Sequence, residues 1–491
     1  MNYKQAALIS GVALMGVSCS DPVEEPLPPV NHPNIIIVFT DDQGYTDLGI
    51  HGADPDVRTP NLDQLARDGV LFTSGYVTAP QCVPSRAGII SGRHQNAFGV
   101  DDNLKGPLPH SEYTIAERLR DHGYVTGMVG KWHLDLVPRE GGGQQASVDY
   151  MPHAHGFMEY FAGSMQRYHA SHDLDGNMLV FPPQIVTDDH YRVDIQTRAA
   201  LSFLERRETD DRPFFLYLAY FAPHSPIEDP PHYMARMTHV QDYVRRMGLA
   251  SILAMDDGIG KIREKLDKMG VTDNTLIFYI SDNGAPLREG AYVGSLNIPM
   301  VGEKGMQTDG GQRVPFIAAW PGHIPAGQIF DEHVWALDAT ATALAVAGAP
   351  VDARIEGVNL MPWLLGEKTG QVHDALYWRW RTQAAILSGN WKFVRLGNTY
   401  RYLFDMSEPG KETASDNKID EHPEIAAELE RKLEEKADTW HIKGLPNTIV
   451  NADQLFFDLH VEQTLPPLPL GQGRTGTYHP WRADRPVPDM P

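Results

Sequence analysis

Carboxylate and amide side chains stand at the ends of two buried, strand-like runs of this sequence. Asp41 and Asp42 come after the run NIIIVFT, and Asp282 and Asn283 come after the run TLIFYI. Ligands bind at the carboxyl ends of strands in open α/β sheets, and these oxygen atoms suit a hard divalent cation. Two adjacent carboxylates without a cation would repel each other. We therefore favour a metal site over the alternative, in which Asp41 and Asp42 only cap the turn at Gly44.

Basic side chains follow two further predicted strands. Lys131 and His133 come after the strand expected at 124–129, and His224 comes after the strand expected at 213–221. Any one of these polar clusters could simply be a solvent-exposed loop at a strand end. The convergence of four such clusters on one edge of the sheet favours a functional site. The net charge of −22 argues against nucleic acid as a partner and against capture of a polyanion by the field of the whole protein. An anionic substrate therefore needs this local group of cations.

Cys82 lies at the predicted start of a helix, in the string CVPSR. Pro84 suits the first helical turn, the unpaired amides of such a start favour an anion, and Arg86 adds a cation one turn along. The chain has only two cysteines, and Cys19 belongs to the N-terminal leader, so Cys82 is the single thiol of the mature protein. Two alternatives stay open: a plain cysteine nucleophile with a lowered pKa, and a small buried apolar residue.

The string CVPSR matches the C-x-P-S-R signature of the formylglycine-dependent sulfatases, a family of the alkaline phosphatase superfamily. Further segments resemble the other motifs of this family, in the same order, over residues 33 to about 350: GKWHL at 130–134, PHSP at 223–226, SDNG at 281–284, KG at 304–305 and GGQRVP at 310–315. One short motif would be weak support, whereas the ordered set is specific. The chain resembles the bacterial members of this family that act on polysaccharides and other glycans.

The resemblance implies a modified residue and a metal ion as cofactors. A formylglycine-generating maturation enzyme would oxidise Cys82, and the aldehyde formed would hydrate to a gem-diol. Calcium would bind the modified Cys82 together with Asp41, Asp42, Asp282 and Asn283. One gem-diol oxygen would attack sulfur, and the second would expel sulfate. A serine or a thiol lacks the second hydroxyl that this step needs.

The resemblance also assigns catalytic roles to basic residues. Arg86 and Lys131 would hold the formylglycine and balance its charge. His133 would hydrogen-bond the gem-diol and take a proton during elimination of sulfate. His224 and Lys304 would contact the sulfate and the leaving oxygen, with His224 as the general acid. Together with calcium, these cations would stabilise the negative charge of the transition state.

Two positions depart from the family pattern, and three others are candidates for substrate binding. Asp135 stands where the family often has glycine, and Asp309 replaces a glutamate, but neither change removes a catalytic atom. We expect contacts to substrate from His155 in a variable loop and from Arg379 and Arg381 in a smaller domain. For His155, simple exposure to solvent is the alternative. Because the two arginines alternate with tryptophans, they could instead form a wet face over a core.

The pattern of apolar runs predicts an α/β protein with a large, mostly parallel sheet flanked by helices, followed by a smaller α+β subdomain with an antiparallel sheet. The N-terminus looks like a signal peptide that ends in a lipobox, with Gly16 in place of the usual leucine and Cys19 as the lipidated residue. Ordinary secretion with cleavage nearby is the alternative. The predicted boundaries are 1–19 for the signal peptide, 20–33 for an acidic, proline-rich tether, 34–355 for the catalytic domain, 356–443 for the subdomain and 444–491 for an irregular tail.

These features predict an exported sulfatase of the periplasm or cell surface, held at the outer membrane only through a lipid anchor. Its substrate would be a sulfated carbohydrate, in the range of algal galactans, ulvan and host glycosaminoglycans. One alternative is a phosphonate or phosphate monoester hydrolase of the same superfamily. Another is a non-catalytic, glycan-binding surface lipoprotein, which the joint presence of Cys82, Arg86, His133, His224 and Lys304 argues against.

Overall fold

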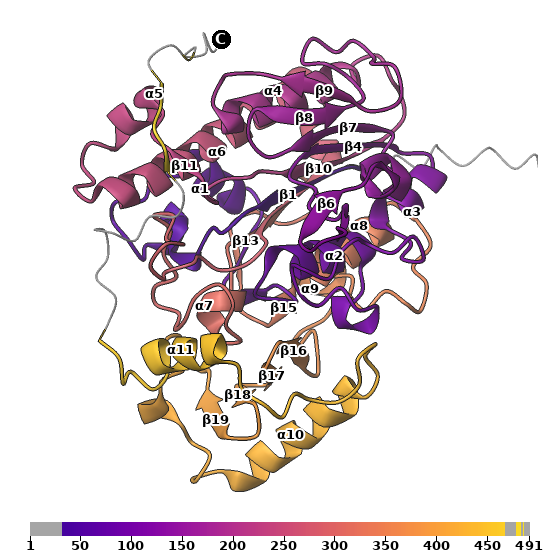
Figure 1. Ribbon diagram of the computed structural model, residues 1–491. Coiled ribbons are helices and arrows are strands. Elements are labelled where there is room, and N and C mark those ends of the chain that lie inside the picture. Colours follow the sequence, from indigo (N-terminus) through magenta and orange to yellow (C-terminus); the bar gives the residue numbers. More distant parts are fainter. Residues whose placement is uncertain (1–31, 467–477, 483–484, 486–491) are drawn as a thin grey trace, which may run out of the picture. The chain divides into compact units, whose positions relative to one another are not determined.

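The computed structural model describes residues 32–466, 478–482 and 485, and Figure 1 shows how their helices and strands are arranged. The predicted signal peptide, the lipidation site Cys19 and the tether up to residue 31 lie outside these residues. Among the described residues, no helix is long and apolar enough to cross a membrane.

A ten-stranded sheet forms the centre of the described chain, in the order β14-β2-β13-β12-β1-β10-β4-β7-β8-β9. The run from β12 to β7 is parallel, while β13 and β8 pair antiparallel with their neighbours. The predicted large, mostly parallel sheet is therefore confirmed. The strands are β1 Asn34–Thr40, β2 Val70–Phe72, β4 Val125–Gly130, β7 Glu159–Gly163, β8 Arg167–Ala170, β9 Gln184–Thr187, β10 Phe214–Ala219, β12 Thr275–Ser281, β13 Phe316–Ala319 and β14 Gln328–Phe330.

The central strand β1 is buried on both faces because successive side chains of a strand point to opposite sides. Ile35, Ile37 and Phe39 pack into one apolar core with helices α2, α3 and α8. Ile36 and Val38 pack into a second core with helices α1, α4 and α6. Helices thus cover both faces, as Figure 1 shows. They are α1 Pro60–Arg67, α2 Cys82–Ser91, α3 Ile115–Asp121, α4 Arg192–Glu205, α6 Tyr243–Lys268 and α8 Ala336–Val346.

A four-stranded antiparallel sheet forms the predicted C-terminal subdomain, with the order β16-β17-β18-β19. Its strands are Leu376–Trp380, Gln383–Ser388, Trp391–Leu396 and Tyr400–Asp405. Helix α10 (Pro423–Ala437) packs on one face. The other face packs on residues of the main domain, among them Tyr76 and Met306. Both faces of this sheet are therefore buried.

The shorter elements connect these layers. They are β3 Gly75–Tyr76, β5 Leu136–Pro138, β6 Gln144–Ala146, β11 Ile227–Glu228, α5 Pro231–Met234, α7 Asp309–Gln312, β15 Val334–Trp335 and α9 Met361–Leu364.

The prediction of an irregular tail after residue 443 is wrong at α11, a helix at Asn451–His460. Phe456 and Phe457 of this helix are 5% and 0% exposed and pack into the same core as the C-terminal sheet. Further along, β20 (Tyr478–His479) pairs in parallel with β11. Because so short a helix is marginal without tertiary packing, its sequence alone gives only a weak signal.

The predicted tether also ends earlier than residue 33. The hydroxyl of Tyr124 donates a hydrogen bond to the carbonyl of Pro33 at 2.9 Å, and the His32 ring packs edge-on against His122. These two residues therefore belong to the fold. The sequence does not predict this, because the strand pattern begins at Asn34 and includes neither His32 nor Pro33.

We expect Phe457→Ala to destabilise the protein, because the change removes a fully buried aromatic side chain that packs on the C-terminal sheet. The free energy of unfolding should fall by about 3–5 kcal/mol. Urea denaturation with a fluorescence readout measures this. Leu455→Ala, on the exposed side of the same helix, is the control and should change stability by no more than about 0.5 kcal/mol. Equal, small effects of both changes would mean that α11 does not support the subdomain.

Candidate active site

The predicted acidic residues meet at the carboxyl edge of the central sheet. Asp41 and Asp42 follow β1, and Asp282 and Asn283 follow β12, which pairs with β1 in parallel up to its last residue. All four residues are at most 2% exposed. Asp42 has a φ of +65°, a left-handed conformation that costs free energy and is frequent at functional sites. The structure therefore brings these four residues together.

Arg86 and Lys131 provide the positive charge next to these acids. Arg86 Nη2 lies 2.7 Å from Asp282 Oδ2 and 3.7 Å from Asp41 Oδ2. Lys131 Nζ lies 2.5 Å from the same Asp41 oxygen. Burial alone would raise the pKa of Asp41, but Lys131, His224 and Arg86 hold it well below its usual range. Burial and Asp41 raise the pKa of Asp282 to about 7.

Cys82 is the first residue of α2 and is 1% exposed, yet polar groups surround it. Its Sγ lies 3.4 Å from Asp41 Oδ1 and 3.1 Å from Lys304 Nζ, which in turn lies 2.5 Å from Asp42 Oδ1. Burial, together with the charge of Asp282, raises the pKa of the thiol to about 12. The surroundings therefore argue against a thiolate nucleophile and against a residue of the apolar core.

The acidic cluster fits a hard divalent cation. Asp41, Asp42, Cys82 and His224 offer ligand atoms that all lie within 4.8 Å of one another. Asn283 donates from Nδ2 to Asp42 Oδ1 at 2.7 Å, while its buried Oδ1 has no hydrogen-bond partner. A buried oxygen without a partner beside several carboxylates is what an oxygen-coordinated cation would explain.

Two histidines face this cluster. The Nδ1 atom of His133 is buried without a partner, and burial and Lys131 lower the pKa of its ring. His224 shares a hydrogen bond of 2.5 Å between Nδ1 and the Ser225 carbonyl, which leaves Nε2 toward Asp42 at 3.7 Å. Burial lowers the pKa of His224 to about 4. Both rings are therefore neutral near pH 7, the state in which an imidazole accepts a proton.

Arg192 orients the loop that carries His224, and no motif or spacing in the sequence points to it. Its guanidinium donates to the carbonyls of His224 and Pro226 at 2.7 and 2.9 Å and is 0% exposed. A charged residue in a helical pattern is normally placed at the surface. Only the folded chain shows that this arginine is buried against the loop.

Lys392 supports the loop that carries Lys304, and it too was missed. Lys392 Nζ lies 2.7 Å from Asp309 Oδ1 and 2.8 Å from Glu412 Oε1, with all three side chains fully buried. Burial raises the pKa of Glu412 to about 7. The departure from the family pattern at Asp309 thus belongs to a buried ion network between α7 and β18. It does not contact the predicted catalytic atoms.

Two of the predicted substrate contacts are wrong. His155 is 1% exposed and stacks on His110 at 5.1 Å and near Trp132, because the loop that carries it folds back onto the core. Arg379 is 6% exposed, donates to two backbone carbonyls and lies over the Trp440 ring at 4.8 Å. The alternating pattern predicted a face open to substrate or to solvent, but helix α10 covers that face of the sheet.

Arg381 remains a candidate for substrate binding. Its side chain is 42% exposed, and its Nε lies 3.2 Å from Asp102 Oδ2, which also accepts from Trp380 Nε1. The neighbouring Asn103 accepts a hydrogen bond from the Val83 amide at 3.0 Å, at the start of α2. The segment around Asp102 therefore connects the C-terminal subdomain to the helix that presents Cys82.

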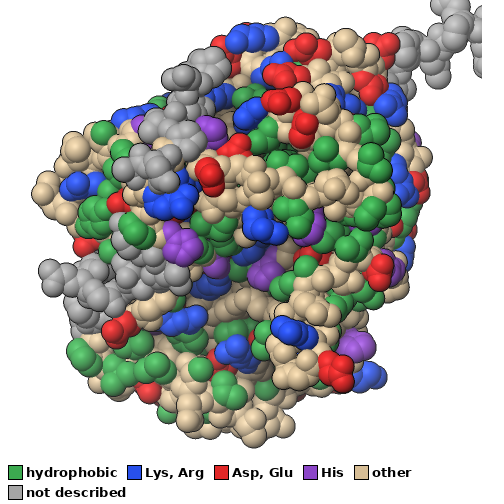
Figure 2. All heavy atoms as spheres, turned by 45° about the horizontal axis from the view of Figure 1, so that its top comes forward, with side chains coloured by type: hydrophobic (Ala, Val, Ile, Leu, Met, Phe, Trp, Pro, Cys, Tyr) green, Lys and Arg blue, Asp and Glu red, His purple; other side chains and the backbone are tan. Residues whose placement is uncertain are grey.

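An open cavity of about 360 Å³ adjoins the site, and Lys131, His133 and His224 are among its lining residues. This volume lies in the range of small-molecule sites. On the face drawn in Figure 2, lysine, arginine and histidine side chains gather around a hollow near the middle of the view.

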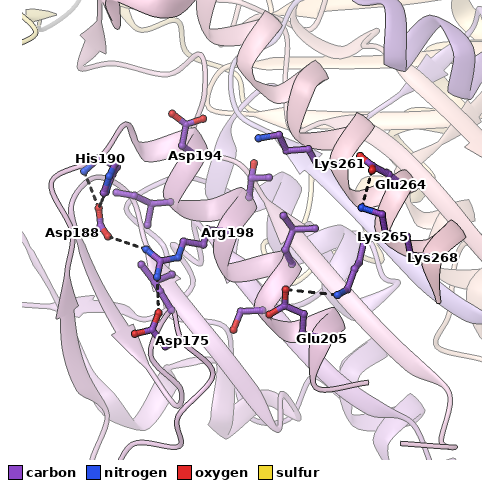
Figure 3. A pocket seen from close by; sticks show the side chains of 15 residues that line it. Asp175, Asp188, His190, Asp194, Arg198, Glu205, Lys261, Glu264, Lys265 and Lys268 are labelled. Carbon is purple, nitrogen blue, oxygen red and sulfur yellow. Dashed lines mark hydrogen bonds and ion pairs between the residues drawn. The ribbon is translucent and has the colours of Figure 1, made fainter. Parts of the chain in front are cut away.

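A larger cavity of about 740 Å³ lies between α4 and α6, and Figure 3 shows its side chains. Its charges pair with each other: Arg198 lies 2.6 Å from Asp175, and Lys268 lies 2.8 Å from Glu264. None of the predicted catalytic or metal-binding residues lines it. Size alone therefore does not identify the active site.

The fold and the site together define the alkaline phosphatase-like class of enzymes that cleave anionic esters. Within this class, the chain belongs to the sulfatase family. Residues 33–349 match the family model "Sulfatase", and residues 302–439 match "N-sulphoglucosamine sulphohydrolase, C-terminal". The protein is accordingly a sulfatase, as the ordered motifs predicted.

Sequence relatives and solved structures agree with this assignment. The chain is 34% identical over 391 residues to the N-acetylgalactosamine-6-sulfatase of Canis lupus familiaris. This alignment covers 73% of this chain and 71% of the relative. It is 34% identical over 370 residues to human arylsulfatase A, with 68% of each chain covered. A crystal structure of Ps i-CgsB in complex with k-i-k-neocarrahexaose has a TM-score of 0.73 and 29% identity, covering 87% of this chain and 97% of that chain.

We expect a divalent cation to stabilise the protein, because it would offset the charge of the buried acids. Addition at 100 times its dissociation constant should raise the free energy of unfolding by about 2.7 kcal/mol. Thermal unfolding after EDTA treatment, with and without added cation, measures this. Asp42→Asn should abolish the response, whereas the exposed Asp211→Asn should keep it. An identical unfolding midpoint with and without cation would contradict the metal site.

Proposed function

We propose that this sulfatase hydrolyses sulfate esters of a carbohydrate, with a formylglycine at position 82 and a calcium ion as cofactors. The observation that carries the proposal is the position of Cys82. It begins a helix, it contacts Asp41 and Lys304, and it lies beside an oxygen-rich cluster. A hydrated aldehyde at this position supplies a nucleophile with the second hydroxyl needed to release sulfate.

In this proposal, the basic residues around Cys82 have two kinds of role, charge stabilisation and proton transfer. Lys131, Lys304 and Arg86 place positive charge where the oxygens of a sulfate group would carry negative charge. His133 has a buried Nδ1 without a hydrogen-bond partner, and in this proposal it takes the proton that is lost during release of sulfate. His224 presents Nε2 to the cavity side of the cluster. Its ring is neutral near pH 7, so the role of general acid to a leaving oxygen requires that Nε2 first takes up a proton.

Calcium is the cation that this donor set favours. Asp41, Asp42, Asp282 and Asn283 offer carboxylate and amide oxygens at the ends of two different strands. Flexible, oxygen-rich sites with several carboxylates suit calcium, whereas magnesium demands a tighter octahedron and keeps more water.

A sulfated carbohydrate is the substrate class that the comparisons favour. The relatives are named N-acetylgalactosamine-6-sulfatase in five mammals, and the solved neighbour Ps i-CgsB carries k-i-k-neocarrahexaose. The open cavity beside the catalytic residues leaves room for a sugar ring. Among algal polysaccharides, ulvan stays a prediction from the sequence.

The rival activities rest on weaker support. A solved phosphonate monoester hydrolase is 20% identical with a TM-score of 0.60, which shows a shared fold alone. A non-catalytic glycan-binding protein would have no need to retain Arg86, His133, His224 and Lys304 around one buried cysteine. Export as an outer-membrane lipoprotein, with maturation by a formylglycine-generating enzyme, completes the proposal and rests on the leader sequence and the CVPSR string.

We expect co-expression with a formylglycine-generating enzyme to convert Cys82. Mass spectrometry of the tryptic peptide that contains Cys82 should show the mass decrease of replacing CH₂SH by CHO. Sulfate release from a sulfated sugar should rise with the converted fraction. Cys82→Ser is the matched variant, and it should lose activity on the order of 10³-fold or more, because serine lacks the second hydroxyl.

A fully active protein with an unmodified Cys82 thiol would overturn the formylglycine mechanism. Faster hydrolysis of a phosphate ester than of the sulfate ester of the same alcohol would favour the phosphate or phosphonate hydrolase. Binding of glycans without any turnover, after confirmed conversion of Cys82, would favour the non-catalytic binder.

A further inference from the structure

Arg167 brings a cation into the cavity that adjoins the catalytic residues. The cavity of about 360 Å³ that Lys131, His133 and His224 line is also lined by Arg167 and His169 of β8. Alternation along the strand explains this placement, since the side chains of Arg167 and His169 lie on one face. Those of the intervening Tyr168 and the following Ala170 are buried in the core on the other face.

Within the part of the chain that the structure describes, the charge of Arg167 has no partner of its own. Its side chain is exposed, and among the described residues its guanidinium makes no hydrogen bond or ion pair. The chain as a whole has 64 acidic residues against 42 basic ones. Arg86, which lies in the catalytic cluster, pairs with Asp282 instead. An unpaired cation beside an active site is available to an anionic ligand.

The other polar groups of the cavity suit a sugar ring. Asp135 is the one acid among the lining residues, and it makes no ion pair in the described part of the chain. The Nδ1 atom of His169 is buried without a partner, and burial and the charge of Arg167 lower the pKa of its ring. A neutral imidazole and a carboxyl group can both accept hydrogen bonds from hydroxyl groups. Asp135 thus forms no ion pair with Arg167 among the described residues. Asp135 and His169 can bind the hydroxyl groups of a sugar ring.

We propose that this cavity is a second anion subsite, in which Arg167 binds a negatively charged group of the substrate other than the sulfate that is cleaved. This inference rests on the proposed function and refines its substrate class to carbohydrates with two anionic groups near each other. The second group is a further sulfate or a uronate carboxylate, since both accept hydrogen bonds from a guanidinium in the same planar geometry. The substrate would lie with its sulfate ester toward Cys82 and its second charge toward β8.

The subsite can be measured by binding to the Cys82→Ser protein, in which turnover is expected to be slower on the order of 10³-fold or more. Calorimetry would compare three probes: N-acetylgalactosamine 6-sulfate, N-acetylgalactosamine 4,6-disulfate, and a disaccharide of glucuronate and N-acetylgalactosamine 6-sulfate. At least one probe with two anionic groups should bind roughly tenfold more tightly than the monosulfated sugar, the effect of one charge-assisted pair. Tighter binding of the disulfated sugar would indicate a subsite for sulfate, and tighter binding of the disaccharide with glucuronate would indicate a subsite for a carboxylate.

Arg167→Gln, made in the same protein, should remove this preference, and Arg167→Lys should retain part of it, since lysine keeps the charge without the planar fork. The matched control is Arg67→Gln, an exposed arginine at the end of α1 that does not line the cavity, and it should leave the affinity ratio unchanged. Equal affinity for all three probes, or a preference that survives Arg167→Gln, would overturn the subsite.

Sulfate release by the matured wild-type protein tests the proposed function separately. If no probe releases sulfate while the affinity ratio still depends on Arg167, the proposed function fails and the subsite stands. If sulfate is released but the ratio does not depend on Arg167, the subsite fails and the proposed function stands.

Discussion

Three carboxylates buried at one edge of a parallel sheet impose the main physical constraint on this protein. Asp41, Asp42 and Asp282 are at most 2% exposed. Each ion taken out of water costs several kcal/mol unless opposite charge and hydrogen bonds replace the solvent. The chain supplies one cation from α2, one from the end of β4 and one from the loop before α7. Burial and Asp41 nevertheless raise the pKa of Asp282, and the buried Oδ1 of Asn283 has no hydrogen-bond partner beside these acids, which a bound dication would explain.

This constraint connects distant parts of the chain to one reaction. In the proposed function, the cations that stabilise the buried carboxylates also face the sulfate group of the substrate. The positive charge that the folded state needs therefore also stabilises the transition state. The loop that carries Lys304 depends on the C-terminal sheet, because Lys392 of β18 pairs with Asp309 in full burial. The antiparallel subdomain is therefore part of the support of the active site, although none of the predicted catalytic residues lies in it.

The sequence was most informative where local pattern and family motif coincide. Asp41 and Asp282 end long apolar strands that pair with each other, so their meeting follows from the sheet alone. The sequence failed where tertiary packing decides. The sequence places His155 in a loop, but its side chain is buried in an aromatic stack. Arg379 was expected to be accessible, but helix α10 covers its face of the sheet, and a local sequence pattern cannot show this packing. Arg192 is buried for the same reason, since the loop it orients is distant in the chain.

A crystal structure of the matured protein, grown with calcium, tests the central claim most directly. The account predicts a cation in contact with oxygens of Asp41, Asp42, Asp282 and Asn283, and a hydrated aldehyde at position 82 that faces it. A fully active crystal in which Cys82 keeps its thiol, and in which Lys304 still pairs with Asp42 with no cation between the acids, would contradict the account.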